Sequence, residues 1–335
     1  ATRGALAWQR ELLTVQAHLT QAGIPCLALK GAYLALHSYP HPALRPLRDL
    51  DLLVPLAHVL AAQRCLLQAG YRAAAVGNWE ACLATKHHLP VLEAPTSRQK
   101  IELHFRLHPL TMRQPHAVVW ERLRGQAVTA SVAGQTITYL APTDLLLHLI
   151  AHAVYQHRFD NGPLLLTDIA YLLQRECIDW RQFWQAAQAR CWSKGCVLVL
   201  RLVTNYYPDL AVDYPQTVQG YLPEVAPLLS ACAELMLSDL NFHADLHLAS
   251  ELAGRSWYQR SRYLLQRLFP APVDIARGYT DAASTSPRII SAYLRRYRLL
   301  LTQRLPRLLN RQQQSSIATD AGRIAVLERW LLRNE

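Results

Sequence analysis

The residues that most clearly suggest chemistry are two aspartates one residue apart, Asp49 and Asp51, in the segment Arg45-Pro-Leu-Arg-Asp-Leu-Asp-Leu-Leu-Val54. Residues at positions i and i+2 of a β-strand point to the same face of a sheet, so a strand here places both carboxylates side by side. Like charges a few ångströms apart raise each other's pKa, and a divalent cation removes that repulsion. The pair therefore predicts a site for Mg²⁺, with Mn²⁺ as the alternative ion.

A third acid occurs in the segment Ile101-Glu-Leu-His-Phe-Arg-Leu107. Strand alternation puts Glu102, His104 and Arg106 on one face, and an acid within an otherwise apolar strand needs a partner. If this strand lies next to the aspartate strand, the three acids can hold two metal ions that bridge a triphosphate and activate an attacking hydroxyl. The chemistry would be nucleotidyl transfer from an NTP. His104 and Arg106 would then contact the acceptor or support the acids.

A site for anions is predicted upstream, where Lys30-Gly31 joins a short apolar strand to the start of a helix. Glycine lets the backbone approach a phosphate closely, helix N-terminal N–H groups point at it, and Lys30 adds a positive charge. Arg45 and Arg48 lie within a few residues of the acids. They either bind triphosphate oxygens or pair with the two aspartates, and the sequence favours neither.

These segments resemble the bacterial "uncharacterised nucleotidyltransferase" family of the DNA polymerase beta-like nucleotidyltransferase superfamily. The resemblance runs from about residue 20 to about residue 175 and rests on Leu27-Ala-Leu-Lys-Gly31, Arg45 to Val54, Glu102-Leu-His104, Asp144-Leu-Leu-Leu-His148, His152 and Leu166-Thr-Asp-Ile-Ala170. It implies that Asp49, Asp51 and Glu102 bind the metal ions and that Lys30 and Gly31 bind phosphate.

The chain departs from the superfamily pattern at two positions. Most members carry Gly-Ser or Gly-Gly where this chain has Lys30-Gly31, and the third carboxylate is commonly an aspartate rather than Glu102. Both changes retune the site or signal lost activity, so a catalytically silent nucleotide-binding scaffold is an alternative function.

Two histidines four residues apart, His148 and His152, have the spacing of helical metal ligands, but no glutamate lies between them as in His-Glu-x-x-His. We expect this helix to face the catalytic cleft, with His152 and Asp168 bracing the interface or contacting the base or acceptor. We assign no role to the pair His87-His88.

The elements that must position these residues form a strand-rich region, residues 24 to about 140, behind an amphipathic helix at residues 5–22. A hairpin is expected around Ala133-Gly134, and Thr143 is the expected N-cap of the next helix. Helical periodicity then continues nearly to the end. We expect an α+β protein: a small mixed-sheet catalytic domain at 1–141 and an all-helical domain at 142–335.

Composition limits the remaining classes. At 335 residues with 51% hydrophobic residues, the chain can bury two modest cores. We see no transmembrane span and no secretory signal, and seven cysteines without a Cys-x-x-Cys pair indicate reduced thiols, so we expect a cytoplasmic protein. The sequence lacks the glycine-rich loops of P-loop and Rossmann proteins and the Gly-x-Ser-x-Gly elbow of hydrolases.

The net charge of +11 is concentrated at the C-terminal end, where the residues from Arg255 onward include fifteen arginines and five acids. Three interpretations stay open: a solvated helix face, a docking site for nucleic acid or another acidic partner, and a membrane-surface helix. The expected reaction moves an NMP from an NTP to a hydroxyl or phosphate of a small molecule, modified peptide or protein, with release of pyrophosphate. A toxin-like transferase acting on tRNA is the alternative acceptor class.

Overall fold

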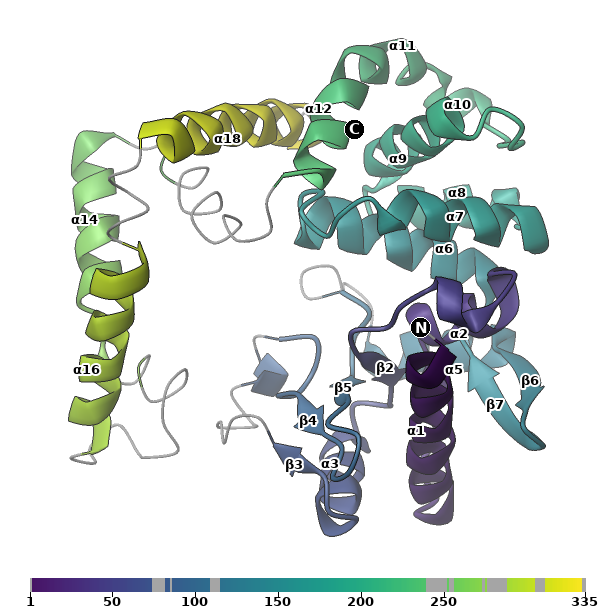
Figure 1. Cartoon of the computed structure of the whole chain (residues 1–335). Coiled ribbons are helices and arrows are strands. Elements are labelled where there is room, and N and C mark those ends of the chain that lie inside the picture. Colours follow the sequence, from purple (N-terminus) through teal and green to yellow (C-terminus); the bar gives the residue numbers. More distant parts are fainter. Residues whose placement is uncertain are drawn as a thin grey trace. The chain divides into compact units, whose positions relative to one another are not determined.

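The computed structural model describes residues 2–73, 82–84, 86–108, 115–238, 252, 256–272, 275, 288–304 and 311–332. The described residues form two compact units (Figure 1). The first contains residues 2–73, 82–156 and 164–223, and the second contains residues 157–163 and those from 224 onward. All of the residues expected to carry chemistry lie in the first unit.

Seven strands of the first unit form a single mixed sheet in the order β3-β4-β5-β2-β1-β7-β6 among the described residues. Their bounds are β1 Leu27–Ala28, β2 Leu50–Leu53, β3 Arg72–Ala73, β4 Leu92–Glu93, β5 Lys100–His104, β6 Val128–Val132 and β7 Gln135–Tyr139. The neighbours β2 and β5 run parallel, as do β1 and β7, and the remaining pairs are antiparallel. The expected hairpin is confirmed, and its turn residues Ala133 and Gly134 both have positive φ.

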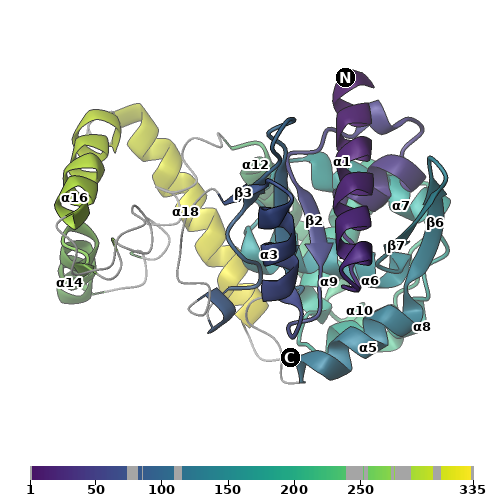
Figure 2. The same cartoon turned by 90° about the horizontal axis from the view of Figure 1, so that it is seen from below.

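Two helices, α1 Thr2–Gln21 and α3 Val59–Gln68, lie side by side along the sheet (Figures 1 and 2). The helix α1 buries Leu12, Val15 and Leu19, which recur every three to four residues as an amphipathic helix requires. It ends before Gly23, whose φ of 69° is the left-handed conformation in which helices commonly terminate. This layer covers the apolar face of the strands and leaves the acidic face to other elements.

The short elements around the Lys30 turn are α2 Gly31–Tyr33, the π-helix η1 Leu34–Ser38 and the 3₁₀-helix η2 Pro42–Leu44. The rest of the first unit is helical apart from β6 and β7: α5 His116–Gln126, α6 Pro142–Ala151, the π-helix η3 His152–Gln156, α7 Leu164–Arg175, α8 Trp180–Gln188, α9 Ser193–Tyr206 and α10 Gln216–Gln219. The helix α6 begins two residues earlier than expected. Ala141 is its N-cap and Pro142 its first residue, so the prediction that Thr143 caps the helix is wrong; the Thr143 hydroxyl instead accepts a hydrogen bond from the backbone N–H of Asp179.

The remaining elements are α11 Leu222–Val225, the 3₁₀-helix η4 Ala226–Leu228, α12 Leu229–Met236, α14 Trp257–Leu268, α16 Arg288–Leu299, the π-helix η6 Leu300–Arg304 and α18 Arg311–Leu332. The helix α18 packs on α12 through a stripe that includes Ile324 and Leu327, and the Trp330 indole donates to Glu224. None of the described helices is long and apolar enough to span a membrane.

The expected α+β class is confirmed, because the described part of the chain after β7 is helical and the sheet precedes it. The helices α6 to α9 belong to the same unit as the sheet. The division into separate domains at 1–141 and 142–335 stays a prediction.

Candidate functional site

The parallel pairing of β2 with β5 brings the predicted acids together. In this register Asp51 lies opposite Glu102 and Leu53 opposite His104. The strand β2 is buried along its whole length, so the carboxylate of Asp51 is only 5% exposed. Asp49 lies immediately before β2 and is half-buried. The condition that the sequence left open, adjacency of the two acidic strands, is thus met.

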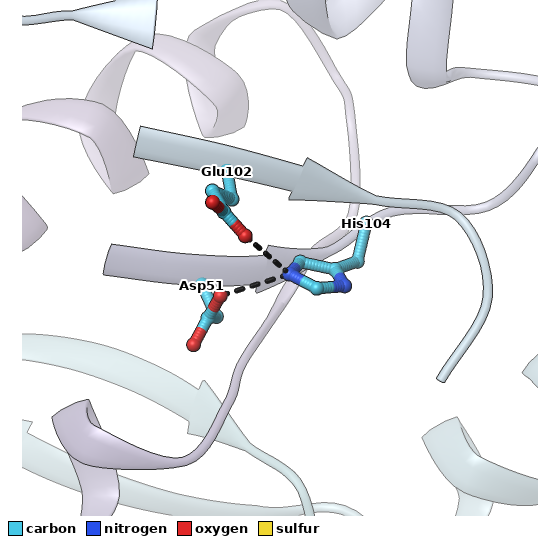
Figure 3. Close-up of side chains that lie close together, drawn as sticks. All are labelled: Asp51, Glu102 and His104. Carbon is cyan, nitrogen blue, oxygen red and sulfur yellow. Dashed lines mark hydrogen bonds and ion pairs between the residues drawn. The ribbon is translucent and has the colours of Figure 1, made fainter. Parts of the chain in front are cut away.

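His104 links the two facing carboxylates (Figure 3). Its Nε2 lies 2.8 Å from Oδ1 of Asp51 and 3.4 Å from Oε2 of Glu102, and it donates to both. Burial alone would lower the pKa of His104, but the hydrogen bonds to the two carboxylates raise it. The two carboxylates therefore favour the protonated imidazole, while its Nδ1 is buried without a hydrogen-bond partner among the described residues.

Lys30 places a positive charge beside the other carboxylate oxygen of Asp51. Its Nζ lies 3.3 Å from Oδ2 of Asp51, and its side chain is 13% exposed. Burial would raise the pKa of Asp51, but Lys30 and His104 hold it well below its usual value. Asp51 is thus an obligate anion in the folded protein.

The backbone at Lys30 is strained in order to deliver this ammonium group. Lys30 has a φ of 42°, which is unfavourable for a residue with a side chain, and it precedes α2 directly. The backbone N–H of Leu29 donates to the carbonyl of Asp51, so the chain turns sharply beside β2 at this point. Strain of this kind persists only where the surrounding structure enforces it, and it concentrates at functional sites.

Asp49 experiences the opposite electrostatic environment. Burial, together with the negative charges of Asp51 and Glu102, raises its pKa to about 6, although the positive charges of Lys30 and Arg45 act to lower it. A carboxylate in this position is unfavourable at neutral pH without an additional cation. A divalent ion fits this site, because it would neutralise the three neighbouring carboxylates.

The carboxylate and imidazole atoms that lie within 4.8 Å of one another belong to Asp51, Glu102 and His104. Asp49 is not part of this compact group among the described residues, although its pKa shift shows that the other two acids are near. Oxygen ligands from carboxylates suit Mg²⁺ and Mn²⁺, and an imidazole nitrogen suits Mn²⁺ better than Mg²⁺.

The space beside Gly31, which the sequence suggested a phosphate would need, is lined by two side chains. A Cβ on Gly31 would lie 2.4 Å from Nη1 of Arg45 and 2.4 Å from a methyl group of Leu47. A side chain at this position would have to displace the ends of these two side chains, and Arg45 is held in place by its ion pair with Asp168. The sequence suggested a phosphate as the group that needs this space.

Arg45 pairs with Asp168. Its Nη2 and Nε donate to the two carboxylate oxygens at 2.7 and 3.1 Å, and the Tyr39 hydroxyl donates to Oδ1 at 2.7 Å. This buried network ties the loop before β2 to α7. Of the two interpretations for Arg45, the structure shows pairing with an acid, but the acid is Asp168 rather than Asp49 or Asp51. Arg48 is exposed.

Arg106 lies beyond the end of β5 and fastens the chain near residues 83–86. Its guanidinium donates to the backbone carbonyls of Leu83 and Lys86 and to the imidazole of His116. Its contacts therefore support the strand end that carries His104.

Several histidines lie near the acids, and two of them, His87 and His88, were given no role from the sequence. His87 and His88 lie against His104, with ring centroids 5.3 and 5.2 Å away, and an isolated bridge pairs His88 with His104. The His88 Nε2 is 4.0 Å from Glu102. The sequence did contain a signal for His87 and His88, because a polar pair beside an apolar, strand-like segment needs a partner on a neighbouring strand.

The helical residues His148 and His152 also lie near the acids. Burial lowers the pKa of His148 well below its usual value, and Lys30 and His104 lower it further. The Nε2 of His148 is buried and has no hydrogen-bond partner among the described residues. His152 helps to lower the pKa of Asp51, as expected for a helix facing the acids.

A comparison with protein families identifies the chain. The family model described as "Uncharacterised nucleotidyltransferase" matches residues 1–208. The chain belongs to the uncharacterised nucleotidyltransferase family. This confirms the resemblance found in the sequence and covers the whole sheet together with α6 to α9. A search of curated proteins found no match for this family member.

Two solved structures were also found. The solution structure of the antibiotic-resistance factor ANT(2'')-Ia matches with 12% identity and a TM-score of 0.32, covering 60% of this chain and 94% of that one. The crystal structure of an antigenic nucleotidyltransferase-like protein from Paracoccidioides brasiliensis matches with 16% identity and a TM-score of 0.33, covering 67% of this chain and 90% of that one.

Proposed function

We propose that the protein transfers an NMP from an NTP to a hydroxyl or phosphate of a small molecule, modified peptide or protein acceptor and releases pyrophosphate. The observation that carries this proposal is the parallel register that sets Asp51 opposite Glu102, with Asp49 one residue outside β2. Three acids at one strand end are the ligand set that two-metal phosphoryl transfer uses. Membership of the nucleotidyltransferase family supports the same reaction class.

Asp49, Asp51 and Glu102 would hold Mg²⁺ or Mn²⁺. When bound, the metal supplies charge neutralisation at the triphosphate and lowers the pKa of the attacking hydroxyl. The elevated pKa of Asp49, about 6, supports this assignment because a cation is the missing partner. Glu102 is the most exposed of the facing pair, with 20% of its side chain accessible, and it is the acid that can reach the acceptor side.

Lys30 would bind the β- and γ-phosphates, together with the backbone N–H of Gly31. Its ammonium group is next to Asp51 and partly exposed, so it can contact both the acid and a bound anion. Arg45 acts through Asp168, and this ion pair fixes the loop that presents Asp49. Arg48, which is exposed close to Asp49, is the further candidate for a triphosphate contact.

His104 is a positioning residue in this proposal. By donating to Asp51 and Glu102 at once, it sets the spacing between the two carboxylates before substrate binds. The imidazoles of His148 and His152 lie near the same acids. The buried Nε2 of His148 offers a hydrogen-bonding group for the base or acceptor.

A catalytically silent nucleotide-binding scaffold is the second candidate, and one observation favours it. Lys30 and His104 already neutralise Asp51 from two sides, as a metal ion would. This candidate predicts that an NTP binds without metal-dependent release of pyrophosphate.

The test is mass spectrometry of the purified protein incubated with each NTP and either Mg²⁺ or Mn²⁺, with a pyrophosphate assay and a tRNA pool in parallel. The proposal predicts metal-dependent pyrophosphate release and an NMP mass on an acceptor, both lost in Asp51→Asn. NMP on tRNA would identify the toxin-like acceptor class. NTP binding with no pyrophosphate under any metal and acceptor tested would overturn catalysis and support the scaffold.

A further inference from the structure

The helices α14 and α16 form an arginine-rich helix pair in the second unit (Figures 1 and 2). The sequence of α14 contains Arg260, Arg262 and Arg267, and that of α16 contains four more arginines. Neither helix contains an acidic residue. The two helices therefore contribute seven positive charges and no negative charge of their own.

The two helices are held together by polar contacts at one end. The Tyr297 hydroxyl donates to the carbonyl of Leu268 at 2.9 Å, the Tyr293 hydroxyl donates to that of Pro270, and the Arg296 guanidinium donates to that of Arg267. These contacts satisfy carbonyls at the C-terminal end of α14, which an isolated helix leaves without partners. At the other end, Ser256 and Gln259 form a capping box. Local interactions thus define α14 at both ends.

Packing contributes little to α14, because none of its residues is buried. Helices of this length are marginal in water without packing of an apolar face. Yet α14 has such a face: Trp257 is 81% exposed, Leu265 56% and Leu268 45%. At 100° per residue these side chains fall on one arc of the helix. The apolar arc of α14 is available to an external partner.

The arginines border this arc. With the same spacing, Arg262 falls on one flank of the arc, and Arg260 and Arg267 fall on the other. Arginine side chains can lay their apolar stems along such a surface and keep the guanidinium in a polar layer. An apolar stripe between two rows of cations is the pattern of helices that lie in the plane of a membrane interface.

The helix α16 also combines exposed apolar residues with arginines. On α16, Ile290 and Leu294 are one turn apart and are 62% and 66% exposed. Aromatic platforms between cations suit nucleic acids, because bases stack on rings. Leucine and isoleucine offer nothing to a phosphate backbone but gain free energy by entering hydrocarbon. These aliphatic side chains favour lipid over nucleic acid, and the exposed Trp257 and Tyr258 of α14 also suit a membrane interface, where aromatic rings with a polar group are enriched.

We propose that the arginine-rich helix pair binds an anionic lipid surface, with the apolar arc of α14 at the boundary between headgroups and acyl chains. Anionic headgroups complement the arginines, and the acyl boundary accepts Trp257, Leu265 and Leu268. The interaction is independent of nucleotidyl transfer, because it uses neither the acids nor the histidines of the first unit. It would place the transferase at a membrane surface.

The test is co-sedimentation of the full chain with vesicles of phosphatidylcholine alone or of phosphatidylcholine mixed with phosphatidylglycerol. We expect binding to the mixed vesicles, weak binding to neutral ones, and loss of binding in high salt. The double variant R260Q/R262Q should lower the partition coefficient roughly fivefold per arginine. Leu265→Asp should lower it by about tenfold or more, because a charge enters the apolar arc.

Two matched controls on α1 test whether the loss of vesicle binding is specific to α14 or follows from any change of surface charge. Leu6→Asp places the same charge on α1 at a similar exposure of 60%, and Arg3→Gln/Arg10→Gln removes the same charge from that helix. Both should bind vesicles like the parent. Trp257→Phe should abolish any blue shift of the tryptophan fluorescence that vesicles induce, and circular dichroism checks that each variant is folded.

Three outcomes would overturn the proposal. The first is equal binding to neutral and anionic vesicles, or none to either. The second is vesicle binding that Leu265→Asp and Leu6→Asp reduce equally. The third is retention of an RNA duplex or tRNA pool that is insensitive to Leu265→Asp and displaces the protein from vesicles, which would assign the helix pair to nucleic acid.

Discussion

The carboxylate cluster of β2 and β5 and the arginine-rich helix pair both concentrate charge of one sign, but in different surroundings. In the cluster, Asp51 is buried and meets Lys30 and His104 at 3.3 and 2.8 Å. On α14, the arginines are exposed and the helix itself contains no acid. Buried charge requires tertiary partners at defined positions, whereas exposed charge is stabilised by water and depends less on any single partner.

This difference predicts that substitutions in the cluster have large effects on activity or folding, whereas substitutions in the helix pair have small effects on folding. The largest effect is expected on turnover. Asp51→Asn should reduce NMP transfer on the order of a thousandfold, because it removes a metal ligand and the partner of both cations. Pyrophosphate release measures the change, and Asp209→Asn, in a loop after α9, is the control that should keep parental activity.

Lys30→Met should lower kcat/KM for the NTP by roughly a hundredfold, since it removes a charge aimed at developing negative charge on phosphate. The matched control is Lys86→Met, because Lys86 is exposed and contacts Arg106 through its backbone carbonyl rather than through its ammonium group. Steady-state kinetics at several NTP concentrations distinguish the two. If both variants behaved alike, the phosphate role of Lys30 would be lost.

The buried ion pair between Arg45 and Asp168 tests whether the cluster depends on its supporting network. Asp168→Asn should lower the free energy of unfolding by about 3 kcal/mol, because it leaves a buried guanidinium without its partner. Tyr39→Phe, which removes a single donor to the same carboxylate, should lower it by about 1 kcal/mol. Urea denaturation measures both, and an effect of Tyr39→Phe as large as that of Asp168→Asn contradicts the assignment.

Substitution of Asp49 should increase the free energy of unfolding, whereas substitution of Asp168 should lower it. Its pKa is raised to about 6 in the folded protein, above its unfolded value, so its ionisation destabilises the fold as pH rises from about 4 through 6. Asp49→Asn should therefore stabilise the metal-free protein by about 1 kcal/mol at pH 7, with no difference below pH 4. Thermal unfolding with a chelator measures this, and added Mg²⁺ should stabilise the parent more than the variant.

The smallest effect is expected on α14. Arg262→Gln should change the free energy of unfolding by less than about 0.5 kcal/mol, because an exposed side chain gives up little on substitution. Urea denaturation beside Asp168→Asn makes the comparison direct. A loss comparable to that of Asp168→Asn would mean that the arginines of the helix pair have intramolecular partners that matter for folding.

The sequence by itself determined the family and indicated the three acids of the candidate site. Asp49, Asp51 and Glu102 were readable because strand periodicity dictates which side chains share a face, and Lys30-Gly31 was readable as a break between a strand and a helix. The excess of arginine near the C-terminal end was also visible, since composition requires no coordinates.

Only the tertiary structure decided how these residues pair. The register of β2 with β5 set Asp51 against Glu102, and the approach of α7 gave Arg45 to Asp168 rather than to the neighbouring aspartates. His87 and His88 lie against His104, although no motif in their segment pointed to the site. A buried charge takes whichever partner folding brings within hydrogen-bonding distance, and that distance depends on chain segments far apart in the sequence.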